Sequence, residues 1–137
     1  MRKELAVAIW LVSALAAEAN ANPPQTRWAG RQPLGIIGLH RPVENECAKD
    51  RVALNGAIVA RQFSSKLTVL LTGITLERPD GGRDFINLEY NPDQYDAMTN
   101  ESTIKALQLL SRIGRVAHTR VYTCGASGRV MVLDELE

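Results

Sequence analysis

The sequence is poor in the residues from which many catalytic and nucleic-acid-binding sites are built. Its 137 residues include two histidines, two cysteines and only 5% aromatic residues, and the net charge is +1. A nearly neutral chain lacks the basic surface that attracts nucleic acid or an anionic membrane. The scarcity of aromatic side chains also weakens the case for a surface that stacks bases. Nucleic-acid binding is therefore not expected.

The few potential metal ligands and nucleophiles do not form a convincing site. His40, Glu44, Glu46 and Cys47 are close in sequence, but a zinc site needs three or four ligands at workable spacing, and a loop rich in proline and acidic residues is the simpler interpretation. The acidic residues within 134–137 predict a solvated segment. We expect no enzyme activity, no metal and no cofactor.

No apolar run reaches the roughly 20 residues that a membrane-spanning helix needs. Residues 5–17 are largely apolar, follow two basic residues and precede the small-residue pattern of Ala19 and Ala21. These are the three parts of a secretory signal peptide. We expect residues 1–21 to be cleaved, leaving a periplasmic or secreted chain of unchanged net charge and without a membrane span.

The expected mature chain divides into a leader and a strongly patterned domain. Residues 22–46 contain four prolines and three glycines, which interrupt helices and strands too often for a long regular element. We expect an extended Pro/Gly-rich leader with a short edge strand over 34–39, followed by a domain over 47–137.

Alternating apolar residues predict five strands in that domain, and a three-residue apolar spacing predicts one helix. The predicted strands span residues 52–63, 66–77, 84–90, 116–124 and 129–136. The predicted helix spans 102–112, with Asn100 or Thr99 as its N-cap, Gly114 as its stop, and Ile104, Leu107, Leu110 and Ile113 along one face.

Two glycines indicate bends in the first two strands. Gly56 interrupts the first strand, and in the second strand the apolar alternation slips by one residue at Thr72-Gly73. A slip beside a glycine is typical of a β-bulge, and the backbone of Gly73 is expected to be strained there. The inward side of the second strand would then comprise Leu67, Val69, Leu71, Ile74 and Leu76.

Three strands, a helix and two strands, with bends in the long first pair, resemble an OB-fold, a small five-stranded Greek-key barrel. The resemblance covers residues 52–136 and rests on element order and bulge placement. We therefore expect a mainly β chain with one helix in an OB-fold-like barrel, the alternative being an irregular α+β sandwich of the same elements.

The two cysteines fit this barrel. An exported domain meets an oxidising compartment, in which two cysteines are expected to pair. In an OB-type barrel the start of the first strand lies against the end of the fourth, and Cys47 and Cys124 occupy these places. We expect a Cys47–Cys124 disulfide, the alternative being two buried free thiols.

Short motifs also resemble small secreted bacterial domains of unknown function. They are a cysteine shortly before Val52-Ala-Leu-Asn-Gly56, the segment Asn91-Pro-Asp-Gln-Tyr95, and Gly114-Arg-Val116 at a strand opening. This resemblance implies a bacterial envelope protein and adds no chemistry.

OB-folds bind oligosaccharides and oligonucleotides on the face of their second and third strands and on the loops that follow the first and fourth. Ile86, Leu88 and Tyr90 are expected to face inward on the third strand. The outward side chains expected on this face are Thr68, Leu70, Phe85, Asn87 and Glu89. Of these, Thr68, Phe85, Asn87 and Glu89 are the candidate ligand-binding residues, although an ordinary polar exterior explains them too.

These expectations favour a non-enzymatic exported binding or accessory module that recognises a protein, peptide or glycan. The alternative is the carbohydrate-binding subunit of a secreted oligomeric toxin, because such subunits are small, disulfide-bonded OB-folds. A small envelope hydrolase is disfavoured, because the sequence shows no nucleophile paired with a base.

Overall fold

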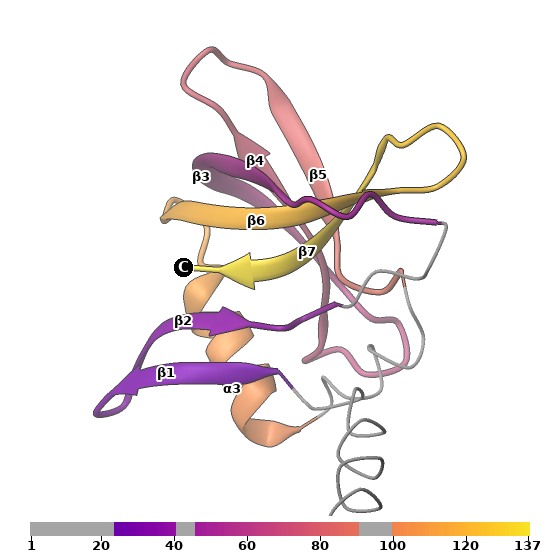
Figure 1. The fold of residues 1–137 in the computed structure, drawn as a ribbon. Coiled ribbons are helices and arrows are strands. Elements are labelled where there is room, and N and C mark those ends of the chain that lie inside the picture. Colours follow the sequence, from indigo (N-terminus) through magenta and orange to yellow (C-terminus); the bar gives the residue numbers. More distant parts are fainter. Residues whose placement is uncertain (1–23, 41–45, 91–99) are drawn as a thin grey trace, which may run out of the picture.

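The computed structural model describes residues 24–40, 46–90 and 100–137, which contain seven strands and one helix (Figure 1). The elements are β1 (Gln25–Ala29), β2 (Gln32–Ile37), β3 (Val52–Phe63), β4 (Leu71–Glu77), β5 (Arg83–Asn87), α3 (Glu101–Leu110), β6 (Val116–Cys124) and β7 (Val130–Leu136). The expected signal peptide, residues 1–21, lies outside the described residues.

Five of the strands close into a barrel in the order β3-β4-β5-β7-β6, with β6 pairing back to β3. All neighbours are antiparallel except β5 and β7, which are parallel. The chain is thus mainly β with one helix and contains a closed five-stranded barrel with extra strands, consistent with the predicted OB-fold-like architecture.

β3 is long because it serves two neighbours in succession. Its first half, from Val52 to Ala57, pairs with β6, and its second half, from Ala57 to Phe63, pairs with β4. Gly56 lies at this changeover, and a Cβ atom there would stand 2.5 Å from the carbonyl oxygen of Glu77. Glycine therefore allows the two strands to approach closely where the barrel turns its corner.

The predicted bulge at Thr72-Gly73 is confirmed, but the strand around it begins later than expected. Gln62 pairs with Gly73 and Phe63 pairs with Leu71, which leaves Thr72 as the additional residue. The strand begins at Leu71 instead of residue 66.

A local turn explains the late start of β4. The Ser64 hydroxyl accepts hydrogen bonds from the backbone N–H groups of Lys66 and Leu67, at 3.1 and 3.2 Å. Such bonds compete with strand pairing. The expected inward residues Leu67 and Val69 are consequently 39% and 45% exposed, whereas Leu70, expected outside, is fully buried.

The helix begins where its cap predicts. The Asn100 side chain accepts hydrogen bonds from the N–H groups of Ser102 and Thr103, so the predicted N-cap is confirmed. The helix ends at Leu110, two residues before the predicted end. Ile113 therefore lies beyond it and is 61% exposed, and the buried face is formed by Thr103, Ala106, Leu107 and Leu110.

Residues 24–40, hereafter the arm, form a hairpin: the short edge strand expected over 34–39 is present as β2, and β1 is an additional strand that was not expected. β2 pairs with β1 along its length and with the end of β7 through Ile36 and Leu136. The register shifts beside Pro33, so the proline occupies an irregular position where a strand tolerates it. Ile36 and Leu39 are buried in the same core as α3 and the barrel, and the hairpin runs beside α3 (Figure 1).

Candidate functional site

On the outer face of β4 and β5, the exposed aromatic ring of Phe85 lies over Gly73. Phe85 is 47% exposed, while its neighbour Ile86 is fully buried, as the alternation of β5 predicts. A Cβ atom on Gly73 would stand 2.7 Å from Cε1 of Phe85. Gly73 does not have a positive φ, so the expectation of a strained backbone there is wrong. Because Gly73 has no side chain, the Phe85 ring has room to lie over it.

The four predicted ligand-binding residues do not form one strip. Phe85 and Asn87 share the outer side of β5, and the side-chain oxygen of Asn87 accepts a hydrogen bond from the N–H of Glu89 at 2.7 Å. Glu89 is exposed beyond the end of the strand, and Thr68 is exposed in the turn before β4. The strip was predicted from a strand over 66–77, and the later start of β4 removes Thr68 from it.

Two hollows border this outer face. The first, the loop hollow, has a volume of about 360 Å³ and lies against the connection between β3 and β4. It is lined by Gln62, Phe63, Ser64, Ser65, Lys66, Thr72 and Glu89. The guanidinium of Arg61 lies 5.2 Å from the centre of the Phe63 ring, which is within cation–π range. The loop hollow is thus lined by the Lys66 amine, the Glu89 carboxylate and the Phe63 ring.

The second hollow, the seam groove, lies between β5 and β7 and has a volume of about 470 Å³. It is lined by Arg83, Asp84, Phe85, Asn87, Arg129, Val130 and Met131. In the described part of the chain, the two strands pair only through Asn87 and Val132. The groove is the space that opens where the strands separate on the Arg83 side of this bridge.

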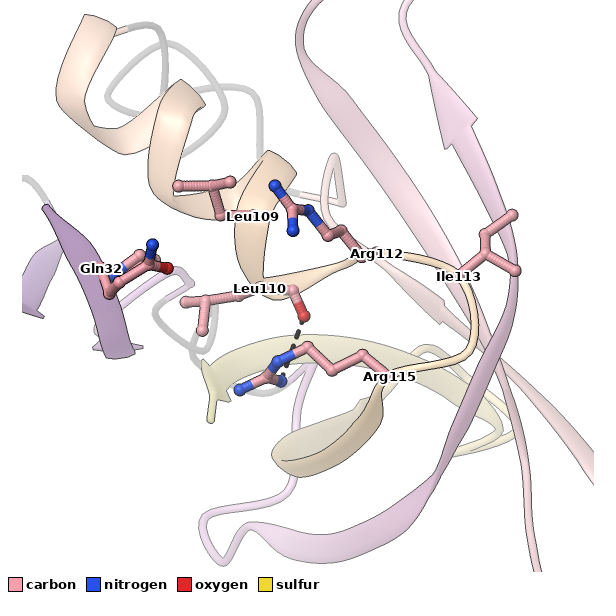
Figure 2. A pocket seen from close by; sticks show the side chains of 7 residues that line it. Gln32, Leu109, Leu110, Arg112, Ile113 and Arg115 are labelled. Atoms are coloured by element: carbon pink, nitrogen blue, oxygen red, sulfur yellow. Dashed lines mark hydrogen bonds between the residues drawn. The ribbon is translucent and has the colours of Figure 1, made fainter.

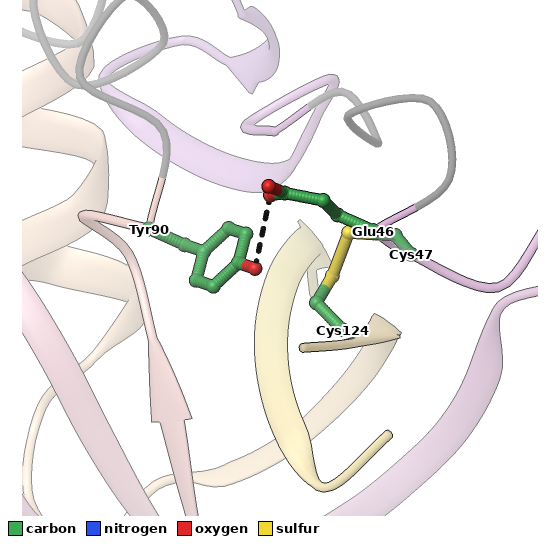
Figure 3. The surroundings of a disulfide bond; sticks show 4 residues. All are labelled: Glu46, Cys47, Tyr90 and Cys124. Atoms are coloured by element: carbon green, nitrogen blue, oxygen red, sulfur yellow. Dashed lines mark hydrogen bonds between the residues drawn. A yellow bond between two sulfur atoms is a disulfide. The ribbon is translucent and has the colours of Figure 1, made fainter. Parts of the chain in front are cut away.

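A disulfide holds the structure beside the seam groove. Cys47 and Cys124 are bonded, as predicted, and form an isolated bridge that is extended by two backbone hydrogen bonds of 2.9 and 2.8 Å (Figure 3). Tyr90 donates a hydrogen bond of 3.2 Å to Glu46, next to the disulfide. The bond fixes the end of β6, from which the 125–129 turn leads to Arg129 and the groove.

A buried polar cluster closes the other end of the seam. The His40 ring donates a hydrogen bond to the carbonyl oxygen of Leu88, just after β5, and its backbone N–H bonds the Asp134 carboxylate of β7. His40 is 1% exposed, and burial lowers its pKa to about 4. Burial also raises the pKa of Asp134, although Arg51, which donates a hydrogen bond of 2.7 Å to it, opposes that shift. This arrangement anchors the arm across both strands.

A third hollow, of about 380 Å³, lies between the arm and the end of α3 (Figure 2). The Arg115 guanidinium donates hydrogen bonds to the carbonyl oxygens of Leu110 and Glu137, at 3.2 and 3.1 Å. The first bond satisfies a carbonyl at the end of the helix, and the second ties Arg115 to the residue after β7. The arginine is therefore engaged in holding the fold, which makes this hollow a weaker candidate than the seam groove.

The described residues do not form a cluster of metal ligands. Across 24–40, 46–90 and 100–137, no three histidine, cysteine or acidic side chains gather as metal ligands. Of the possible zinc ligands considered from the sequence, Glu44 lies outside these residues, and Cys47 forms the disulfide. Over the same residues, no helix has the length and apolar character to cross a membrane. The geometry suits binding through an exposed ring, apolar walls and charged side chains.

Comparison with known proteins identifies no relative. No family model matches the chain, and neither the curated proteins nor the solved structures include a significant match.

Sequence reasoning missed several residues around the two hollows, above all Phe63, Lys66, Arg129 and Met131. A signal for them was present, since the loops after the first and fourth strands of an OB-fold border its ligand face. Residues 64–70 and 125–129 are those loops here. Including the side chains of these loops would have found Lys66 and Arg129.

Proposed function

We propose that this protein is an exported, non-enzymatic binding module that recognises a protein, peptide or glycan on the outer face of β4 and β5. One observation carries the proposal: Phe85 is 47% exposed and lies over a glycine beside the seam groove. An exposed aromatic ring on a rigid sheet offers a large contact area that loses little freedom on binding. The disulfide supports an oxidising, periplasmic or secreted location.

The proposal is tested by screening the purified chain against a glycan array and a random peptide library. Ligands recovered by the native protein are then measured with Phe85→Ser and with the control Ile113→Ser, which removes an exposed apolar side chain elsewhere. Loss of a central aromatic contact costs binding about tenfold or more, whereas the control retains native affinity. Recovery of no ligand by either screen, or equal effects of both variants, contradicts the proposal.

Export is tested separately by cell fractionation and mass spectrometry of the accumulated chain. We expect the chain to begin at Asn22 and to be found outside the cytoplasm. A chain that retains Met1 and the apolar segment contradicts cleavage. Light scattering of the same material addresses the alternative function, because a toxin subunit predicts a ring of several copies.

A further inference from the structure

The seam groove exposes a strand edge as well as side chains. β5 has β4 on one side, but on its other side the pairing with β7 consists of the single bridge between Asn87 and Val132 in the described residues. From Arg83 to Ile86 the second edge of β5 therefore faces the groove. Unpaired edges of this kind accept an additional strand.

The direction of the backbone groups along β5 follows from the hydrogen bonds at its two ends. The N–H of Leu88 donates to Thr72 of the β4 side at 2.8 Å, and the carbonyl of Gly82 accepts from Arg78 at 2.8 Å. Backbone groups alternate in direction along an antiparallel strand, so residues 82, 84, 86 and 88 direct theirs to β4.

The intervening residues direct their backbone groups away from β4. Asn87 accordingly pairs with β7, and Arg83 and Phe85 present an N–H and a carbonyl each to the seam groove. Arg83 and Phe85 are two positions apart, which is the spacing at which the residues of one strand form hydrogen bonds with a neighbouring strand.

The charges around the groove favour an acidic partner. Arg129 has no ion pair with any described residue, whereas Asp84 is only 11% exposed and lies 3.5 Å from Arg78. Arg83 already pairs with Glu77 at 3.0 Å. The groove therefore retains one uncompensated positive charge beside the apolar surfaces of Phe85 and Met131.

We propose that the seam groove binds an extended acidic peptide segment of a partner protein, which adds to β5 as a further strand. Its backbone pairs with Arg83 and Phe85, an acidic side chain lies beside Arg129, and apolar side chains contact Phe85 and Met131. Main-chain hydrogen bonds then supply affinity and the alternating side chains supply specificity. This inference rests on the proposed binding function and names the ligand class and the mode of binding.

The experiment selects a library of random linear peptides, each about 12 residues long and so longer than the exposed edge of β5. The native chain, in the form that cells accumulate, serves as bait, and the affinity of the recovered peptides for Arg83→Pro is measured afterwards. Proline at this position removes an N–H that faces the groove but no hydrogen bond to β4. Arg83→Ala is the matched control, because both variants lose the guanidinium and only proline loses the donor.

We expect the recovered peptides to be rich in aspartate and glutamate, and to bind Arg83→Pro at least about tenfold more weakly than Arg83→Ala. Arg129→Ala weakens binding about tenfold, whereas Arg112→Ala, an exposed arginine at the end of the helix, leaves it unchanged. A peptide methylated on alternate backbone nitrogens loses binding to the native protein, which tests edge pairing without altering the chain.

Peptides that bind Arg83→Pro and Arg83→Ala equally, or that tolerate methylation at every backbone nitrogen, overturn strand addition. Peptides without acidic enrichment overturn the ligand class. If glycans, or peptides in the loop hollow, are bound instead, the inference fails while the binding module stands. If no library yields a ligand, both proposals fail.

Discussion

The two sides of β7 are held in different ways. On one side β7 pairs with β6 through six residue pairs, and the disulfide between Cys47 and Cys124 ties the end of β6 to the preceding segment. On the other side one bridge joins β7 to β5, and His40 connects the two strands beyond it. The comparison shows a barrel that is firmly closed along one seam and partly open along the other, where the exposed Phe85 and the groove lie.

The largest effect is expected on the closed side. Replacing both Cys47 and Cys124 with alanine removes a crosslink between residues 77 positions apart, which the chain-entropy model values at about 4 kcal/mol. We expect the free energy of unfolding, measured by urea denaturation, to fall by about 2–5 kcal/mol. A loss below about 1 kcal/mol would show that the backbone bonds of β6 and β7 suffice without the disulfide.

On the open side, Gly73→Ala tests the contact between the glycine and Phe85. The new methyl group overlaps the ring, so we expect a loss of about 1–3 kcal/mol in the free energy of unfolding. In a Phe85→Ala background the overlap is absent, and the same substitution is then expected to be nearly neutral. An equal loss of unfolding free energy in both backgrounds would contradict this contact and would show that the backbone conformation at residue 73 requires glycine.

The connection through His40 predicts a pH dependence. Its folded-state pKa of about 4 lies below the unfolded value of 6.5, so the unfolded chain binds the proton more readily. His40 therefore contributes full stability above pH 6.5, and this is lost as the pH falls toward 4. Between pH 7.5 and 5 the loss is about 2 kcal/mol by linkage.

The His40 contribution is isolated by comparing the native chain with His40→Gln, which cannot be protonated. Between pH 7.5 and 5, we expect the free energy of unfolding of the variant to fall by about 2 kcal/mol less than that of the native chain. Parallel curves for the two proteins would contradict the buried neutral histidine. Asp134, whose pKa is raised, acts in the opposite direction, because its protonation favours the folded state as the pH falls.

The barrel could be predicted from the sequence because apolar residues alternate along its strands and mark the face that is buried. Alternation identified β3 and β6 at their observed bounds, and the slip at Thr72 located the bulge. The start of β4 could not be predicted, because the hydrogen bonds of Ser64 depend on a turn that apolar alternation does not record. The first strand of the arm, β1, was missed because the prolines and glycines of this segment resemble those of a linker.

The candidate site was less predictable than the barrel. Phe85 and Asn87 followed from the alternation of β5, and Thr68 failed with the start of β4. Arg129 and Met131 meet Phe85 only because β5 and β7 lie side by side and then separate. That juxtaposition depends on the tertiary fold, and no local pattern in either segment records it.

The open seam is tested most directly by hydrogen exchange of individual backbone amides in the native chain, measured by NMR. Arg83 and Phe85 direct their N–H groups into the groove, whereas Asp84 and Ile86 direct theirs to β4. We predict rapid exchange at Arg83 and Phe85 and slow exchange at Asp84 and Ile86. Slow exchange at all four amides would show that the edge of β5 is already paired, and it would contradict an open seam available to a peptide.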